Sequence, residues 1–273
     1  MLLQHLRCCT YNPVKHYNLN IGLLQTGDPA DFAVVKDLKH FDVLWTYIDG
    51  VLVSANGQTK IASVDENPIN IFKAQKLNPE DLVVPALENE IKVIRAFDGQ
   101  LITEAFITEA KIDKGNIISD PQTDVLKIVV LNRYADSKPS IAFVQGFGMQ
   151  KGAIASTVAH DSHNIIAVGV NDDEIAKAIN LVIKEKGGIS IVNGAEYKVL
   201  PLPVAGLMSN LDGYQVACMY EEINAAAKCL GTKLITPYMT LSFMALLVIH
   251  SLKLSDKGLF DGINFQFTNI FAK

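Results

Sequence analysis

Five consecutive polar side chains, from His160 to Asn164, form the densest group in the sequence that could carry chemistry. If Asp161 and Ser162 form the two-residue loop of a β-hairpin, His160 and His163 become a cross-strand pair with Cβ atoms ~5 Å apart. One turn of helix would also bring the two imidazoles together, whereas an uninterrupted strand would send them to opposite faces. Such a pair could bind a metal or a substrate. The alternative is a polar turn without a ligand.

A Ser-His-Asp triad does not fit these residues, because neighbours on one turn cannot align nucleophile, base and orienting acid in series. Two histidines are also too few for a catalytic metal, which generally needs three or more protein ligands and an open position. The sequence has no HxH, HExxH or CxxC motif, and its other histidines lie in unrelated segments, at positions 5, 16, 40 and 250. We therefore assign no metal ligand to this chain.

A glycine-rich stretch precedes this group, with Gly146, Gly148 and Gly152. It resembles a dinucleotide-binding loop, but the spacing is GxGxxxG rather than GxGxxG, and no acidic residue closes a following βαβ unit. We interpret Gly146 and Gly148 as residues that permit a tight turn or a close backbone approach. A dinucleotide-binding oxidoreductase stays as a third, minor hypothesis of function.

The segments around these residues predict an α+β fold. Asn171 and the two residues after it should cap a helix that ends near Lys186. Apolar residues at spacings of three and four predict a second helix over 212–230. The early strands lack crossover helices between them, so a mixed, largely antiparallel sheet with packed helices fits better than a doubly wound sheet. The predicted strands of this part are 91–97, 105–112, 125–131, 141–144, 165–170 and 189–192.

The N-terminal part has its own pattern. A short helix should end at Asn12-Pro13, because the residue before a proline resists helical geometry. Asp49-Gly50 stands between β-branched and aromatic runs, which is a strong hairpin signal. The strands predicted here are 31–35, 43–48 and 51–54, followed by turn-rich residues over 55–80.

Composition narrows the classes of function. The chain has 273 residues, 49% of them hydrophobic and 19% charged, with a formal net charge of -5. This excludes a disordered protein and gives no basic surface for nucleic acid or an anionic membrane. The longest apolar run, 243–249, is far shorter than the ~20 residues that span a bilayer. The N-terminus has no secretory pattern, so we expect a cytoplasmic location and four reduced cysteines.

Residues 151–166, KGAIASTVAHDSHNII, closely resemble a signature of the C-terminal domain of bacterial-type adenine deaminases in the amidohydrolase superfamily. Further resemblances follow in order, at 200–209 (LPLPVAGLMS), 239–243 (MTLSF) and 252–261 (LKLSDKGLFD). Near the N-terminus, Asn12-Pro13, Ile21-Gly22 and 27–35 resemble the end of the amidohydrolase barrel and its small β-sandwich.

The resemblance implies three regions. Residues 1–68 would be the end of the barrel plus a partial β-sandwich, 69–83 a linker, and 84–273 the α+β domain. Such enzymes convert adenine and water to hypoxanthine and ammonia, with manganese or iron at a two-metal site inside a (β/α)₈ barrel. A barrel takes ~250 residues, so we expect this chain to begin after almost all of it and to have little activity alone.

The resemblance also suggests roles for the polar segment. We expect His160 and His163 to assist proton transfer, and Asp161, Ser162 and Asn164 to contact the substrate. An Asn amide offers the donor and acceptor that read a purine edge. The expected partners are adenine, in the complete enzyme, and a barrel domain or further copies of the chain. The alternative function is a catalytically silent binding or assembly module that retains the fold.

Overall fold

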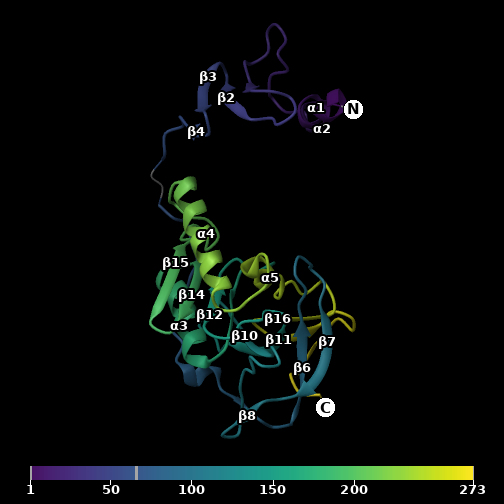
Figure 1. Cartoon of the computed structure of the whole chain (residues 1–273), viewed down its shortest axis with the longest axis vertical. Coiled ribbons are helices and arrows are strands. Elements are labelled where there is room, and N and C mark those ends of the chain that lie inside the picture. Colours follow the sequence, from purple (N-terminus) through teal and green to yellow (C-terminus); the bar gives the residue numbers. More distant parts are fainter. Residues whose placement is uncertain (1, 65–66, 273) are drawn as a thin grey trace. The chain divides into compact units, whose positions relative to one another are not determined.

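The computed structural model describes residues 2–64 and 67–272. The chain divides into two compact units, Met1–Asp65 and Glu66–Lys273 (Figure 1). We call them unit 1 and unit 2. The three regions predicted above, 1–68, 69–83 and 84–273, stay a prediction about the origin of the segments.

Unit 1 consists of short helices and one small antiparallel sheet in the order β1-β2-β3-β4. The Asp49-Gly50 turn is confirmed, since both residues have positive φ. The predicted helix end at Asn12-Pro13 is wrong. Pro13 lies in the first turn of α2, where a missing N–H breaks no helical bond. The elements are α1 (Leu2–Cys9), α2 (Tyr11–Tyr17), β1 (Phe32–Val35), β2 (Val43–Ile48), β3 (Val51–Ala55) and β4 (Gln58–Thr59).

Unit 2 is built on an eight-stranded sheet in the order β15-β14-β12-β13-β10-β11-β6-β7. Only the β11–β6 pair is parallel, so the sheet is mixed and largely antiparallel, as predicted. The strands of this sheet are β6 (Glu90–Arg95), β7 (Glu104–Glu109), β10 (Leu126–Leu131), β11 (Ser140–Gln145), β12 (Ala153–Ser156), β13 (Ile165–Gly169), β14 (Gly188–Asn193) and β15 (Glu196–Pro201).

Helices and smaller sheets complete unit 2. Asn171 caps α3 as predicted, because its side chain accepts a hydrogen bond from Glu174 N. The elements are η1 (Pro79–Leu82), β5 (Val84–Pro85), β8 (Ile112–Asp113), β9 (Asn116–Ile117), α3 (Asp172–Lys184), α4 (Gly213–Lys228), α5 (Pro237–Phe243), β16 (Leu252–Ser255), β17 (Gly258–Asp261) and β18 (Gln266–Thr268).

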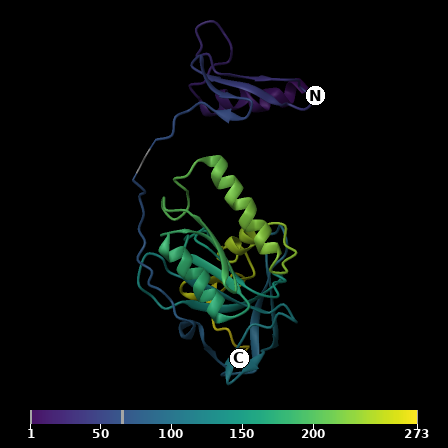
Figure 2. The ribbon, with the colours of Figure 1, turned by 60° about the vertical axis from the view of Figure 1, so that its left-hand side comes forward.

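The large sheet is buried on both faces. On β10, Ile128 and Val130 join the apolar cluster that includes α4 and α5, whereas Val129 and Leu131 join the cluster that includes α3. Because side chains alternate between the faces of a strand, these two clusters lie on opposite sides of the sheet. Figure 2 shows α3 and α4 as separate helices on the outside of unit 2. The fold class predicted from the sequence is therefore confirmed.

Two strand pairings position the polar segment 160–164. Strands β12 and β13 are antiparallel neighbours, and β10 lies on the other side of β13 with Leu131 opposite Ile165. The chain that leaves β10 therefore lies beside the chain that enters β13. Among the described residues, no helix is both long enough and apolar enough to cross a membrane.

Candidate functional site

The polar segment lies in the loop 157–164 between β12 and β13. The hairpin exists as predicted, but its loop is longer than the two residues expected, so His160 and His163 are not a cross-strand pair. Thr157, the first residue of the loop, donates from its N–H and hydroxyl to the carbonyls of Gly188 (3.0 Å) and Gly206 (2.6 Å), which lie outside the β12–β13 hairpin. We call residues 160–164 the histidine loop.

The two imidazoles nevertheless lie side by side. Their ring centroids are 5.7 Å apart, with planes at 70°. The His160 ring also stacks on the Phe243 ring, with centroids 5.2 Å apart. The backbone N–H of His160 donates to Ser242 O at 3.1 Å. Helix α5 therefore fixes His160, and the prediction that the histidines converge is met by a loop and not by a strand pair.

His163 has an unusual environment. Its backbone is left-handed, with φ of 51°, although its N–H still donates to Ala159 O at 2.7 Å. A non-glycine residue in this region costs about 1–3 kcal/mol, which the surrounding structure must supply.

The Nδ1 atom of the His163 imidazole is buried without a hydrogen-bond partner. Burial, and then the charges of His160 and Arg133, lower the pKa of His163, while Asp161 opposes them. The imidazole is therefore neutral near pH 7.

The other three predicted residues divide into two kinds. Asp161 and Ser162 are exposed, but Asn164 is only 2% exposed. The Asn164 amide accepts from Arg133 N at 3.2 Å and donates to Ser162 Oγ at 3.2 Å. Both ends of this amide are thus used within the chain, and its role as a purine contact stays a prediction.

The sequence did not predict the residues that support the loop. Arg133 and Tyr134 follow β10, and Tyr134 donates from its hydroxyl to Ser162 O at 2.9 Å. Lys253 is fully buried and donates to Phe243 O at 3.0 Å and to Leu101 O at 2.7 Å. Burial lowers the pKa of Lys253 to about 8. One signal was available, since a cation directly after or inside an apolar strand needs a specific partner.

Comparison with known families agrees with this fold. Residues 100–266 match the family described as the adenine deaminase C-terminal domain. The chain belongs to the adenine deaminase C-terminal domain family. Residues 1–53 match the amidohydrolase family, so a short amidohydrolase segment precedes the adenine deaminase domain.

Curated adenine deaminases are similar along nearly the whole chain. The protein of Methanosarcina barkeri is 50% identical over 276 residues, which cover 98% of this chain and 50% of the relative. That of Sulfurovum sp. is 51% identical, with coverage of 97% and 49%, and that of Salinibacter ruber is 47% identical, with 98% and 49%. The chain therefore spans about half the length of these adenine deaminases.

A metal ion does not fit the described part of this adenine deaminase segment. Amidohydrolase membership implies a metal in a complete enzyme. Within residues 2–64 and 67–272, however, no group of three or more His, Cys, Asp or Glu side chains is placed to hold one. The histidine loop is thus an imidazole pair with hydrogen-bonding neighbours, and we assign it no metal.

The glycine stretch of the adenine deaminase domain has a structural role. Gly146 and Gly148 have φ of 107° and 66°, and their N–H groups donate to the Asp124 carboxylate at 2.8 and 2.7 Å. A Cβ at Gly146 would lie 2.3 Å from Ala96 O. The interpretation as a tight turn with close backbone approach is confirmed. These N–H groups are occupied by a carboxylate and so are not offered to a phosphate.

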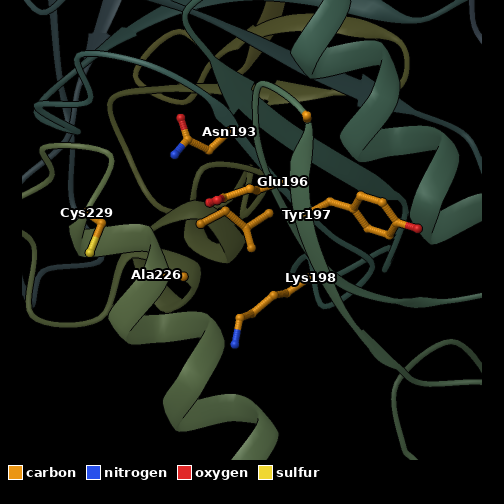
Figure 3. A pocket seen from close by; sticks show the side chains of 8 residues that line it. Asn193, Glu196, Tyr197, Lys198, Ala226 and Cys229 are labelled. Atoms are coloured by element: carbon orange, nitrogen blue, oxygen red, sulfur yellow. The ribbon is translucent and has the colours of Figure 1, made fainter.

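Two cavities lie near α4 in the adenine deaminase domain. One, of about 490 Å³, separates the β14–β15 hairpin from α4; Figure 3 shows Glu196 pointing into it and Tyr197 pointing away. The other, of about 430 Å³, is mostly apolar and is lined in part by Val158, Met239 and Ser242. The second cavity adjoins the histidine loop, because Ser242 O accepts the hydrogen bond of His160 N. Small-molecule sites are generally concave and mostly apolar, with a few polar groups.

Proposed function

We propose that this chain supplies the C-terminal half of an adenine deaminase, which converts adenine and water to hypoxanthine and ammonia. The match of residues 100–266 to the adenine deaminase C-terminal domain carries this proposal. The metal of the complete enzyme, which we propose to be manganese or iron, would be held by residues outside the described part of the chain. A cytoplasmic location and association with a barrel domain or with further copies are also predictions.

We assign the histidine loop to the mouth of the active site. Loss of the exocyclic amine as ammonia requires that the leaving nitrogen gain a proton, and a positioned imidazole is the usual carrier. His163 is neutral near pH 7 and lies 5.7 Å from His160 between ring centroids, so the pair can accept a proton and pass it on. Asp161 and Ser162 are exposed, and we propose that they contact the substrate from the loop.

A catalytically silent module is the second candidate. It is favoured by the absence of a metal-binding group of side chains among residues 2–64 and 67–272. In that case, the loop would serve only to hold β12 and β13 together, and variants in it would affect stability alone.

A chimera separates these two functions. The C-terminal half of the Methanosarcina barkeri adenine deaminase is replaced by this chain, and adenine deamination is measured with added manganese or iron. We expect an active chimera in which His163→Ala lowers kcat at least about 100-fold, the usual contribution of general acid-base catalysis. His250→Ala is the matched control, since His250 is exposed and lies outside the loop.

The outcomes are distinct. A folded chimera without activity would favour the silent module, and an active chimera with unchanged turnover in His163→Ala would remove the role of His163. The chain alone should show little or no deamination of adenine with added manganese. Robust turnover by the chain alone would contradict the proposal that the metal is held elsewhere.

A further inference from the structure

Arg133 is a buried cation beside the histidine loop. Its side chain is only 4% exposed, and within the described part of the chain no carboxylate forms an ion pair with it. Its Nε atom is buried without a partner. A buried charge without a counter-ion is costly, and an apolar residue of similar size would often be more stable. Stability alone therefore does not account for an arginine at this position.

We infer that Arg133 is the positioning residue of the histidine loop: its guanidinium fixes Ser162 through Tyr134, its backbone N–H fixes Asn164, and its charge acts on the imidazole of His163. This inference deepens the proposed function and rests on it for its catalytic meaning. The contacts themselves do not depend on the reaction.

The contacts reach the loop at two points, one from the main chain and one from the side chain. The backbone N–H of Arg133 donates to Asn164 Oδ1 at 3.2 Å, which fixes the residue after His163. The guanidinium Nη2 donates to Tyr134 Oη at 2.9 Å, and that hydroxyl donates to Ser162 O at 2.9 Å, which fixes the residue before it. His163 thus lies between Asn164, which bonds to the main chain of residue 133, and Ser162, which the guanidinium reaches through Tyr134.

Further contacts hold the guanidinium itself. Nη1 donates to Asn70 Oδ1 at 3.0 Å, and the guanidinium carbon lies 4.4 Å from the centroid of the Tyr134 ring. Asn70 in turn donates to Lys186 O at 2.6 Å and Pro203 O at 2.9 Å. A planar group with several fixed donors suits this arrangement, whereas a lysine could not make the same set of bonds.

The charge of Arg133 acts on His163 together with two groups of the loop. His160 and Arg133 disfavour the imidazolium form and Asp161 favours it, while burial is the largest cause of the lowered pKa of His163. Arg133 therefore helps to keep the imidazole neutral, which is the form that can accept a proton.

Two variants of Arg133 test this inference in the chain itself. The pKa of His163 is measured by NMR titration of histidine side chains labelled with ¹³C, with His163→Gln used to assign the signal. Arg133→Met removes the charge and should raise the pKa of His163 above that of the wild type. Arg133→Lys retains the charge and should leave this pKa close to the wild-type value. The pKa of His250 serves as an internal control.

Tyr134→Phe tests the mechanical link without changing any charge. It removes only the hydroxyl between the guanidinium and Ser162 O. Loss of one hydrogen bond should speed hydrogen exchange of the His163 N–H roughly fivefold, whereas exchange of Val168 N–H in β13 should stay as in the wild type. If Arg133→Met fails to fold, Tyr134→Phe still tests whether the loop is positioned through this hydroxyl.

An unchanged pKa of His163 in folded Arg133→Met would overturn the electrostatic part of the inference. Unchanged exchange of His163 N–H in Tyr134→Phe would overturn the positioning part. Neither measurement requires deamination, so both test the inference even if the chain takes no part in adenine deamination. In an active chimera, Arg133→Met should also shift the pH profile of kcat, and a change in stability alone would not do this.

Discussion

The two units use the same kind of strand pairing but differ in what they bury. Every buried apolar side chain among the described residues belongs to unit 2. In unit 1, large apolar side chains on the sheet stay exposed, including Trp45 at 42%, Ile48 at 51% and Val51 at 63%. A small sheet needs a covered apolar face for stability. Unit 2 therefore carries its own core, whereas the large apolar side chains on the sheet of unit 1 stay uncovered.

Truncation of a leucine in each unit gives the largest expected difference. Leu126 of β10 is fully buried, and Leu38 of unit 1 is 49% exposed. Leu126→Ala should lower the free energy of unfolding of unit 2 by about 2–5 kcal/mol, because it removes buried contacts and leaves a cavity. Leu38→Ala should change stability by less than about 0.5 kcal/mol. Chemical denaturation of both variants checks this, and equal losses would contradict the comparison.

The pH dependence of stability should also differ between the units. The pKa of Lys253 is lowered from 10.5 to about 8 in the folded chain. Between these values the unfolded state binds more protons, so the stability of unit 2 should rise with pH. Between about pH 8 and about pH 9.5 the rise should be on the order of 2 kcal/mol, since this interval covers roughly 1.5 pKa units worth about 1.4 kcal/mol each.

Urea unfolding at about pH 7 and pH 9.5 measures this rise. Lys253→Met should remove most of it, whereas Lys39→Met, at an exposed position of unit 1, should leave it as in the wild type. The same rise in Lys253→Met and in the wild type would assign the effect to another group.

Helix capping gives the smallest expected difference. The Asn171 side chain caps α3 by accepting from Glu174 N at 2.9 Å, whereas Thr10, at the N-cap of α2 in unit 1, makes no such bond. Asn171→Ala should cost about 1 kcal/mol, and Thr10→Ala should cost a few tenths at most. Thermal unfolding of the two variants checks this, and a larger loss for Thr10→Ala would show that α2 depends on this residue.

The sequence predicted most of the secondary structure because its signals are local. Strong β-branched runs predicted β10, β13 and β14, and Asn171 predicted the start of α3. The error at Asn12-Pro13 arose because a proline is compatible with the first turn of a new helix as well as with the end of an old one. The order of strands in the sheet depends on contacts between distant residues, which a local pattern does not contain.

The sequence pointed to residues 160–164 as the candidate site but did not predict the length of their loop or the contacts that hold it. The two imidazoles of the histidine loop do lie together, yet the loop runs over 157–164 and not over two residues, and its first residue, Thr157, bonds to Gly188 and Gly206. Likewise, nothing near Asn164 in the sequence indicates that Arg133 fills its amide acceptor. Backbone groups of distant segments therefore bond to Thr157 and Asn164, and a local sequence pattern does not contain these contacts.

The position of Trp45 has a spectroscopic consequence. It is the single tryptophan of the chain, and it lies on the uncovered sheet of unit 1. Selective excitation of its indole therefore reports on unit 1, while unit 2 contributes no tryptophan emission. A shift of this emission to shorter wavelength on addition of a candidate partner would signal that the sheet has been covered, and no label would have to be attached.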